Sequence, residues 1–133
     1  MNVLRTSEFI LERLNTVLKP FDLTFTQYNV LRILRGAGDQ GLICSELAQR
    51  MIARDPDITR LLDRMERRSL ISRARQPKDR RVVLARIADT GQKLLDESRL
   101  PMQEAMRGMM GGLGKTGLQS LIKLLEDVRA ESR

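Results

Sequence analysis

The chain has 133 residues, 41% of them hydrophobic, and its 24 Lys and Arg outnumber its 17 Asp and Glu, so the formal net charge is +7. This length fits one domain, and the composition is that of a globular protein rather than a disordered basic tail. The lack of histidine excludes a Ser-His-Asp triad, a histidine metal site and a histidine pH switch. The single cysteine, Cys44, fits a reducing compartment, and no apolar run approaches the ~18 residues of a membrane span, so we expect a cytoplasmic protein with no membrane contact.

The first predicted element is an amphipathic helix that stops before Pro20, because the residue before a proline disfavours helical geometry. Leucines recur on one face of this helix at the spacing of helical turns: Leu11, Leu14 and Leu18. A helix with this pattern needs an apolar surface to pack against.

A second helix is predicted to begin at Thr24, which has Gln27 three residues later. This spacing is that of a capping box, in which each side chain bonds to the backbone N–H of the other residue. The glycines in residues 36–38 end this helix, and residues 45–51 are predicted to form a short third helix.

A basic helix is predicted to start at Asp55-Pro56, which supplies an N-cap and a proline at the first helical position, and to run to about Arg68. Apolar residues recur along its length at helical spacing: Ile58, Leu61, Leu62 and Met65. We expect this face to lie in the core, which leaves the basic face exposed.

A β-hairpin is predicted next, because two alternating runs, residues 71–75 and 82–87, flank the turn-like residues 76–80. Helix and hairpin hold most of the net charge, since the 22 residues from Arg60 to Arg81 contain nine Lys and Arg but three Asp and Glu. A basic helix followed by a basic hairpin is typical of a winged helix-turn-helix, in which the helix enters a major groove of DNA. The alternative is a solvated basic face.

The rest of the chain is predicted to be helical. A long helix over about 88–110 contains Pro101, which should bend it, and the glycines of residues 111–114 end it. A last helix carries an apolar stripe: Leu118, Leu121, Ile122 and Leu125. We expect the amphipathic helices at the two ends to pack against a second copy of the chain, the alternative being that they pack on their own module.

In this order of elements the sequence resembles the MarR (multiple antibiotic resistance regulator) family of winged-helix transcription factors. Four segments carry the resemblance, with Thr90-Gly91 beyond them: 23–31 (LTFTQYNVL), 45–48 (SELA), 58–73 (ITRLLDRMERRSLISR) and 79–81 (DRR). Each segment alone is a weak motif, but all four occur in the family's order and spacing and span nearly the whole chain.

The resemblance implies one domain over residues 1–133, mainly α with a small β-hairpin wing. Its winged helix-turn-helix is expected at about 22–88 and its dimerisation helices at about 1–20 and 89–133. Family members commonly act as homodimeric repressors that are released by small phenolic or lipophilic ligands, by oxidation or by metals. We therefore expect a sequence-specific repressor that binds a palindromic double-stranded operator, responds to a small-molecule inducer and needs no cofactor.

Base contacts are expected from the exposed early face of the basic helix, because an arginine can bind guanine O6 and N7 with two hydrogen bonds. The candidates are Arg54, Asp57, Thr59, Arg60 and Arg64. Asp55 and Asp57 suit the helix dipole but repel phosphates. Either one of them accepts a hydrogen bond from a cytosine amine or both only cap the helix, and capping is favoured.

Backbone or minor-groove contacts are expected from the basic side chains of the wing: Arg73, Arg75, Lys78, Arg80 and Arg81. Asp79 would repel DNA if left alone, and the resemblance implies that it pairs with Arg81 and holds the hairpin tip in shape. The alternative for Arg73 and Arg75 is a solvated strand face.

Some positions depart from the family pattern or leave alternatives open. Ser69 stands where glycine is usual after the basic helix, and Ile43 stands where a serine or threonine cap is usual. Cys44 is predicted not to be the main redox switch, because oxidation-sensing members carry their cysteine near the first helix. The four methionines at 102, 106, 109 and 110 could line a ligand cavity, but ordinary core or dimer packing is favoured.

Two other functions compete with this one. A nucleoid-type or RNA-binding protein would use the same charge without sequence specificity, but the basic segment contains no aromatic residue to stack on single-stranded bases. An enzyme is not expected, because no paired carboxylates, activated nucleophile, metal cluster or phosphate loop can be assembled from the sequence.

Overall fold

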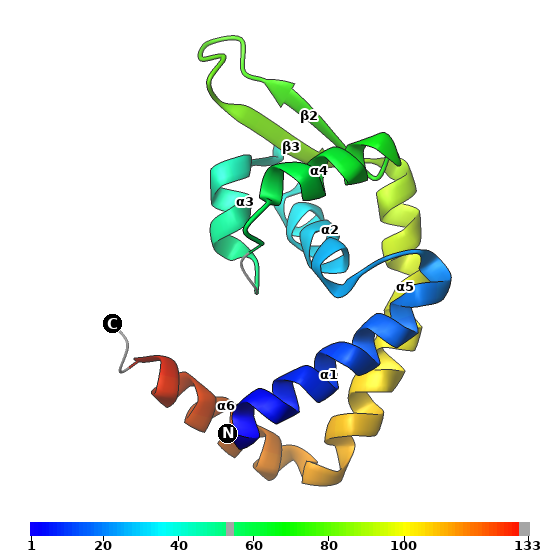
Figure 1. The fold of residues 1–133 in the computed structure, drawn as a ribbon, viewed down its shortest axis with the longest axis vertical. Helices are drawn as coiled ribbons and strands as arrows, with labels where there is room; N and C mark the ends of the chain where they lie inside the picture. Colours follow the sequence, from blue (N-terminus) through cyan, green and yellow to red (C-terminus); the bar gives the residue numbers. More distant parts are fainter. Residues whose placement is uncertain (53–54, 131–133) are drawn as a thin grey trace.

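The structure is a computed structural model that describes residues 1–52 and 55–130. Its elements are, in chain order, α1 (Asn2–Leu18), η1 (Lys19–Phe21), α2 (Phe25–Ala37), η2 (Gly38–Gln40), β1 (Leu42–Ile43), α3 (Cys44–Arg50), α4 (Ile58–Arg67), β2 (Ile71–Arg75), β3 (Val83–Ile87), α5 (Asp89–Met110), η3 (Gly111–Leu113) and α6 (Gly114–Ala130). Figure 1 shows α2, α3, α4 and the sheet gathered in one lobe, which we call the winged lobe, while α1 and α6 lie beyond it along α5. The predicted mainly helical fold with a hairpin wing is confirmed.

Helix α2 begins as the sequence predicts. The Thr24 hydroxyl accepts from the backbone N–H of Gln27 at 3.2 Å, and the Gln27 side chain accepts from the N–H of Thr24 at 3.1 Å. The apolar residues of α2 are fully buried: Val30, Leu31 and Leu34. Helix α2 is therefore part of the core that carries the rest of the lobe.

Helix α4 begins later than the sequence predicts, with Asp57 rather than Asp55 as its N-cap. The Asp57 carboxylate accepts from the backbone N–H of Arg60 at 3.2 Å, and a carboxylate of Asp55 accepts from the N–H of Asp57 at 2.8 Å. The expected cap at Asp55 is therefore wrong. Both aspartates match the cap pattern, and only the path of the chain decides which of them faces the open N–H groups of the first turn.

The turn that ends α4 keeps a glycine-like conformation at Ser69, which has φ 59°. Ser69 N–H donates to the carbonyl of Glu66 at 2.9 Å, and Leu70 N–H donates to the carbonyl of Met65 at 3.0 Å. These two bonds form a Schellman motif. A residue with a side chain in this left-handed conformation costs about 1–2 kcal/mol relative to the right-handed one, so the turn is preserved under strain.

The wing is an antiparallel hairpin of β2 and β3, with Ile71 opposite Ile87 and Arg75 opposite Val83. The predicted strands are confirmed to within one residue. The sheet has the order β1-β3-β2, since the two residues of β1 pair with β3 on the other side. The sequence did not predict β1, because two residues are too few to show an alternating pattern.

Two contacts join the winged lobe to the start of α5. A Cβ atom at Gly91 would lie 2.2 Å from the carbonyl oxygen of Leu70, so only glycine fits this close approach. Arg35 on α2 donates to the Gln92 side chain and carbonyl, both at 2.9 Å, and pairs with the Asp96 carboxylate at 2.7 Å. The first turns of α5 are thus fixed to the lobe.

Further along, α5 contains Pro101, which has no N–H to donate to the carbonyl of Glu97. Near the missing bond, Ser98 is fully buried and its hydroxyl donates to the carbonyl of Leu95 at 3.3 Å. Figure 1 shows that α5 bends as it passes from the winged lobe to the terminal helices. Pro101 thus lies inside α5, where the sequence predicts a bend.

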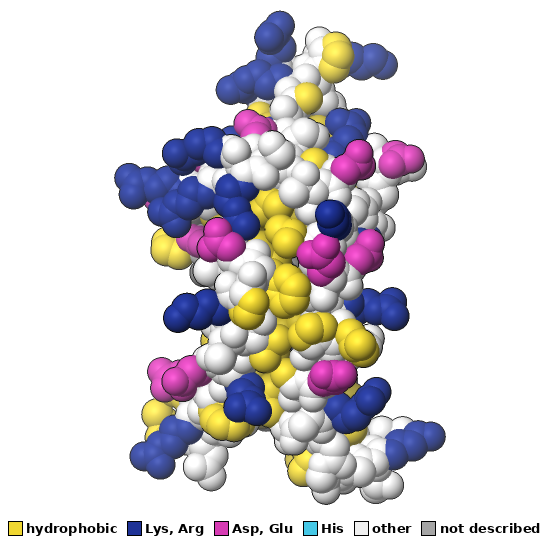
Figure 2. All heavy atoms as spheres, turned by 90° about the vertical axis from the view of Figure 1, so that its right-hand side faces the viewer, with side chains coloured by type: hydrophobic (Ala, Val, Ile, Leu, Met, Phe, Trp, Pro, Cys, Tyr) yellow, Lys and Arg dark blue, Asp and Glu magenta, His cyan; other side chains and the backbone are white. Residues whose placement is uncertain are grey.

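The terminal helices expose apolar surface. On α6, whose residues are all described, none is buried, and Ile122 is 56% exposed. Leu11, Leu118, Leu121 and Leu125 are half-buried, but Leu14 and Leu18 are buried in the protomer's own core, so the expectation that these two form a dimer contact needs correction. Figure 2 shows an apolar band running down the face that includes α5. No helix among the described residues is long and apolar enough to cross a membrane.

Candidate nucleic-acid interface

Helix α4 has one apolar face and one basic face. Leu61, Leu62 and Met65 are buried, since they recur at the spacing that keeps them on the lobe side of the helix. The exposed side chains on the other side include Thr59, Arg60, Arg64 and Arg67. Arg54, which the sequence also predicts as a base contact, lies outside the described residues.

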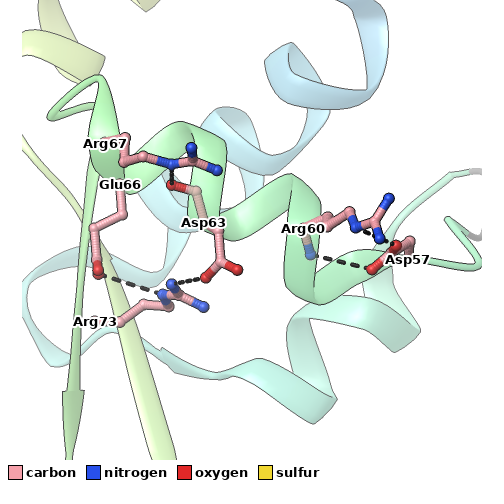
Figure 3. Close-up of polar contacts among 6 residues, drawn as sticks. All are labelled: Asp57, Arg60, Asp63, Glu66, Arg67 and Arg73. Carbon is pink, nitrogen blue, oxygen red and sulfur yellow. Dashed lines mark hydrogen bonds and ion pairs between the residues drawn. The ribbon is translucent and has the colours of Figure 1, made fainter.

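At the exposed N-terminal end of α4, the N-cap residue of the helix, Asp57, contacts the side chain of Arg60. Arg60 is 74% exposed, and its Nε lies 3.2 Å from Oδ2 of Asp57 (Figure 3). The same aspartate holds the backbone N–H of Arg60 through Oδ1. This end of α4 therefore presents a guanidinium at the surface in a defined position.

The C-terminal half of α4 is clamped to the wing by Arg73, whose side chain is 19% exposed. Its guanidinium donates to Asp63 and, at 3.3 Å, to Glu66, both on α4 (Figure 3). Partial burial acts to lower the pKa of Arg73, but the hydrogen bonds to Asp63 and Glu66 outweigh it and raise that pKa above its ordinary value. The guanidinium thus remains charged and bridges β2 to α4.

This clamp changes the expected role of Arg73. The sequence predicts a DNA contact from it, with a solvated strand face as the alternative, whereas in the structure its Nε and one of its outer nitrogens donate within the protein. The sequence gives only a weak signal of this clamp. Asp63 and Glu66 are three residues apart, so they share one face of a helix, and an arginine follows in the next strand.

The tip of the wing is held by short local bonds. Asp79 accepts from the backbone N–H of Arg81 at 3.1 Å and from its Nε at 3.2 Å, which is the pairing that the resemblance implies. Arg75 donates to the carbonyl of Arg80 at 2.6 Å. The side chains of Lys78 and Arg80 are exposed, so the tip presents positive charge from a fixed turn.

A groove of about 870 Å³ continues the basic surface from α4 toward the end of α1. Its cationic lining residues come from two distant parts of the sequence: Lys19, Arg64, Arg67 and Arg68. Arg68 also donates to the carbonyl of Asp22 at 2.6 Å, which ties the end of α4 to the turn before α2. Sequence reasoning missed both Lys19 and Arg68. Arg68 lies one helical turn after Arg64, whereas only the fold brings Lys19 beside these arginines. Figure 2 shows Lys and Arg gathered at the top and upper left of the molecule.

Cys44 begins α3 without a side-chain cap before it, since Ile43 is the N-cap residue, as expected. Burial raises the pKa of the Cys44 thiol; the charge of Arg73 opposes this shift and that of Glu66 adds to it. The thiolate is therefore disfavoured, which supports the prediction that Cys44 is not the main redox switch. Of the four methionines, Met102 is buried in the core, Met109 and Met110 are half-buried, and Met106 is exposed.

Within residues 1–52 and 55–130, no group of three or more His, Cys, Asp or Glu side chains could hold a metal ion. Helices α3 and α4 together with the basic hairpin of β2 and β3 have the arrangement of a winged helix-turn-helix. A helix with exposed arginines beside such a hairpin defines the class of winged-helix DNA-binding proteins.

The comparisons with known proteins agree. The model of the MarR family matches residues 23–83. An uncharacterized HTH-type transcriptional regulator of Bacillus subtilis, YhbI, is 31% identical over 84% of this chain and 71% of its own length. A crystal structure of a MarR transcription factor from Planctomyces limnophilus is 35% identical, covers 93% of this chain and 90% of its own, and has a TM-score of 0.74. The chain belongs to the MarR family of transcriptional regulators.

A third relative bears on the direction of regulation. The homoprotocatechuate degradative operon repressor of Escherichia coli is 28% identical over 94% of this chain and 83% of its own length. These relatives are named as transcriptional regulators rather than as enzymes.

Proposed function

We propose that this regulator is a cytoplasmic homodimer that represses transcription by binding a palindromic operator and releases it when a small-molecule inducer binds. The observation that carries the proposal is the division of the surface. Exposed arginines cluster on α4 and the wing, whereas the exposed large apolar side chains of the described residues, apart from Ile52, lie on or beside α1, α5, η3 and α6. A two-fold dimer through the terminal helices would present two copies of α4 to a two-fold symmetric DNA site.

Within this proposal, the parts of the basic surface have different tasks. Thr59, Arg60 and Arg64 contact base edges, because they belong to the early, exposed face of α4. Arg54 is proposed for the same role from the sequence alone. The wing contacts the DNA backbone or minor groove through Arg75, Lys78, Arg80 and Arg81. Arg73 keeps the wing and α4 in register instead of touching DNA.

The dimer contact uses the apolar side chains that a single chain leaves exposed on α1 and α6: Val3, Leu4, Phe9, Ile122, Leu124 and Val128. Leu11, Leu118, Leu121 and Leu125 extend this surface, since they are half-buried. The winged lobe of about 22–88 then forms the DNA-binding unit, and the helices on both sides of it form the dimerisation unit. An exposed surface of this kind is typical of an interface between copies.

The proposal that this protein represses transcription and is released by an inducer rests on its similarity to the homoprotocatechuate degradative operon repressor. A repressor of degradation is useful only if the compound to be degraded, or a product of it, releases the operator. We propose that the inducer binds in the cleft between the winged lobe and the dimer helices. Bound there, it would change the distance and angle between the two winged lobes of the dimer.

Selection from a random duplex library, followed by binding assays and sedimentation, tests the proposal. We expect a dimer and an enriched palindrome that binds at least about 10³-fold tighter than random duplex. Removing residues 119–133 should give monomer or aggregate and lose tight binding. A preference of less than about 10-fold would favour a non-specific nucleoid-type protein.

A second comparison separates the helix from the wing. Arg64→Ala should relax the sequence preference, because base contacts specify the site. Lys78→Ala should weaken binding to all duplexes alike and lower the slope of log affinity against log salt by about one unit. Wing variants that change the preference while helix variants do not would reverse this assignment.

A further inference from the structure

Asp57 uses its two carboxylate oxygens for two contacts with the same residue, one hydrogen bond and one ion pair. Oδ1 accepts from the backbone N–H of Arg60 at 3.2 Å, and Oδ2 lies 3.2 Å from the Nε of Arg60 (Figure 3). The pair holds the guanidinium by its inner nitrogen. The two outer nitrogens carry the N–H donors that can form the two-pronged bond to guanine O6 and N7.

We infer that Asp57 is a positioning residue for base recognition: it aims the Arg60 guanidinium at one base pair and does not contact DNA itself. The inference rests on the proposed role of α4 in the major groove. It differs from both interpretations of the sequence, a cytosine contact by one of the aspartates or helix capping alone, because the carboxylate acts through another side chain.

The position of Asp57 is itself fixed by the turn before the helix. A carboxylate oxygen of Asp55 accepts from the backbone N–H of Asp57 at 2.8 Å. Asp57 in turn holds both the backbone and the side chain of Arg60. A free arginine side chain loses rotamer freedom when it binds a base, so an arginine that is already held loses less.

Asp57 also places a negative charge at the end of α4 that is proposed to face DNA. This charge repels the phosphates of every duplex, whatever its sequence. The residue therefore lowers the affinity for random DNA while it raises the discrimination at the base pair that Arg60 reads. These two effects have opposite signs, which a helix cap alone does not produce.

The test compares Asp57→Ser, Arg60→Ala and the double variant on the selected operator, on operators changed at one base pair at a time, and on random duplex. Serine caps a helix about as well as aspartate but is too short to hold the guanidinium, so thermal unfolding should stay near wild type. Arg60→Ala should lower discrimination at one base pair by about 10-fold or more. Asp57→Ser should lower it at the same base pair by about 2–5-fold, the range of an exposed ion pair, and should bind random duplex more tightly.

The matched control is Asp55→Ser, which removes a carboxylate from the same end of α4, while the serine hydroxyl can still accept from the backbone N–H of Asp57 and so keep the Asp57–Arg60 pair in place. It should tighten binding to random duplex without changing discrimination. The double variant should discriminate no worse than Arg60→Ala alone, because Asp57 acts only through Arg60.

The outcomes separate the inference from the proposed function. If Arg60→Ala leaves every base preference unchanged, the proposed base contact of α4 is wrong, and the inference falls with it. If Arg60→Ala relaxes one preference and Asp57→Ser does not, only the inference is overturned, and Asp57 is a cap. A preference that Asp57→Ser alters at a different base pair would show that the carboxylate contacts DNA directly, which also overturns it.

Discussion

The two ends of α4 use the same chemistry for different purposes. At its N-terminal end, Arg60 pairs with Asp57 while its side chain is 74% exposed. Toward its C-terminal end, Arg73 pairs with Asp63 and Glu66 while its side chain is 19% exposed. A covered guanidinium with its donors bonded inside the protein serves the scaffold, whereas an exposed one keeps donors for a partner. The role of an arginine therefore follows from its burial and bonds rather than from its charge.

Gly91→Ala should have the largest effect, because it disturbs the scaffold behind the C-terminal end of α4. The new Cβ would lie 2.2 Å from the carbonyl oxygen of Leu70, so the backbone must shift. We expect a loss of about 3 kcal/mol in the free energy of unfolding, measured by chemical denaturation. Gly108→Ala is the control, since its Cβ meets nothing within 4 Å and should stabilise α5 slightly. Equal stability of both variants would mean that the backbone at Leu70 can move away from the new Cβ at little cost in free energy.

Arg73→Ala tests the clamp directly. It removes a half-buried guanidinium and leaves Asp63 and Glu66 side by side without their partner, so we expect a loss of about 2 kcal/mol. Arg75→Ala, two residues further along the exposed strand, should change the free energy of unfolding by about 0.5 kcal/mol or less. We expect Arg73→Ala to keep the DNA sequence preference and Arg60→Ala to relax it, which would sharpen the contrast between a scaffold arginine and a DNA-contacting one. The reverse pattern would contradict it.

Ser69→Gly should have the smallest effect and the opposite sign. Glycine adopts φ 59° without the steric strain of a side chain, although it also loses more backbone entropy on folding. We expect a gain of about 0.5–1 kcal/mol, detected as a higher midpoint of denaturation. Ser72→Gly, in the ordinary extended backbone of β2, should destabilise instead. If Ser69→Gly also destabilised, the serine side chain would have a compensating contact at the end of α4.

The parts of the fold that the sequence predicted are those set by local signals. The capping box of Thr24 and Gln27 acts over three residues, and the wing strands show their alternation within five. The glycines of 111–114 mark the end of α5 in the same way. Such signals need no knowledge of the neighbouring elements.

The parts that it did not predict depend on distant neighbours. Arg73 and Arg75 look alike in the sequence, and only the packing of β2 against α4 makes one a clamp and leaves the other exposed. The basic groove joins Lys19 to Arg68 across 49 positions of the chain (19 to 68), which no spacing rule reveals. The choice of Asp57 over Asp55 as the cap depends on where the chain enters the helix.

Pro101 gives α5 a point at which the helix can bend, so the first half of α5 can act as a lever. Arg35 fixes the winged lobe to Gln92 and Asp96, so the lobe must follow any rotation of the first half of α5. Asp89 lies twelve residues before Pro101, or about 18 Å at 1.5 Å per residue, so a rotation of about 10° at the proline would carry the lobe about 3 Å. The carbonyl of Glu97 has no helical N–H partner to resist that rotation. In the proposed complex with DNA, a change in the angle of α5 at Pro101 would therefore move α4 along the duplex.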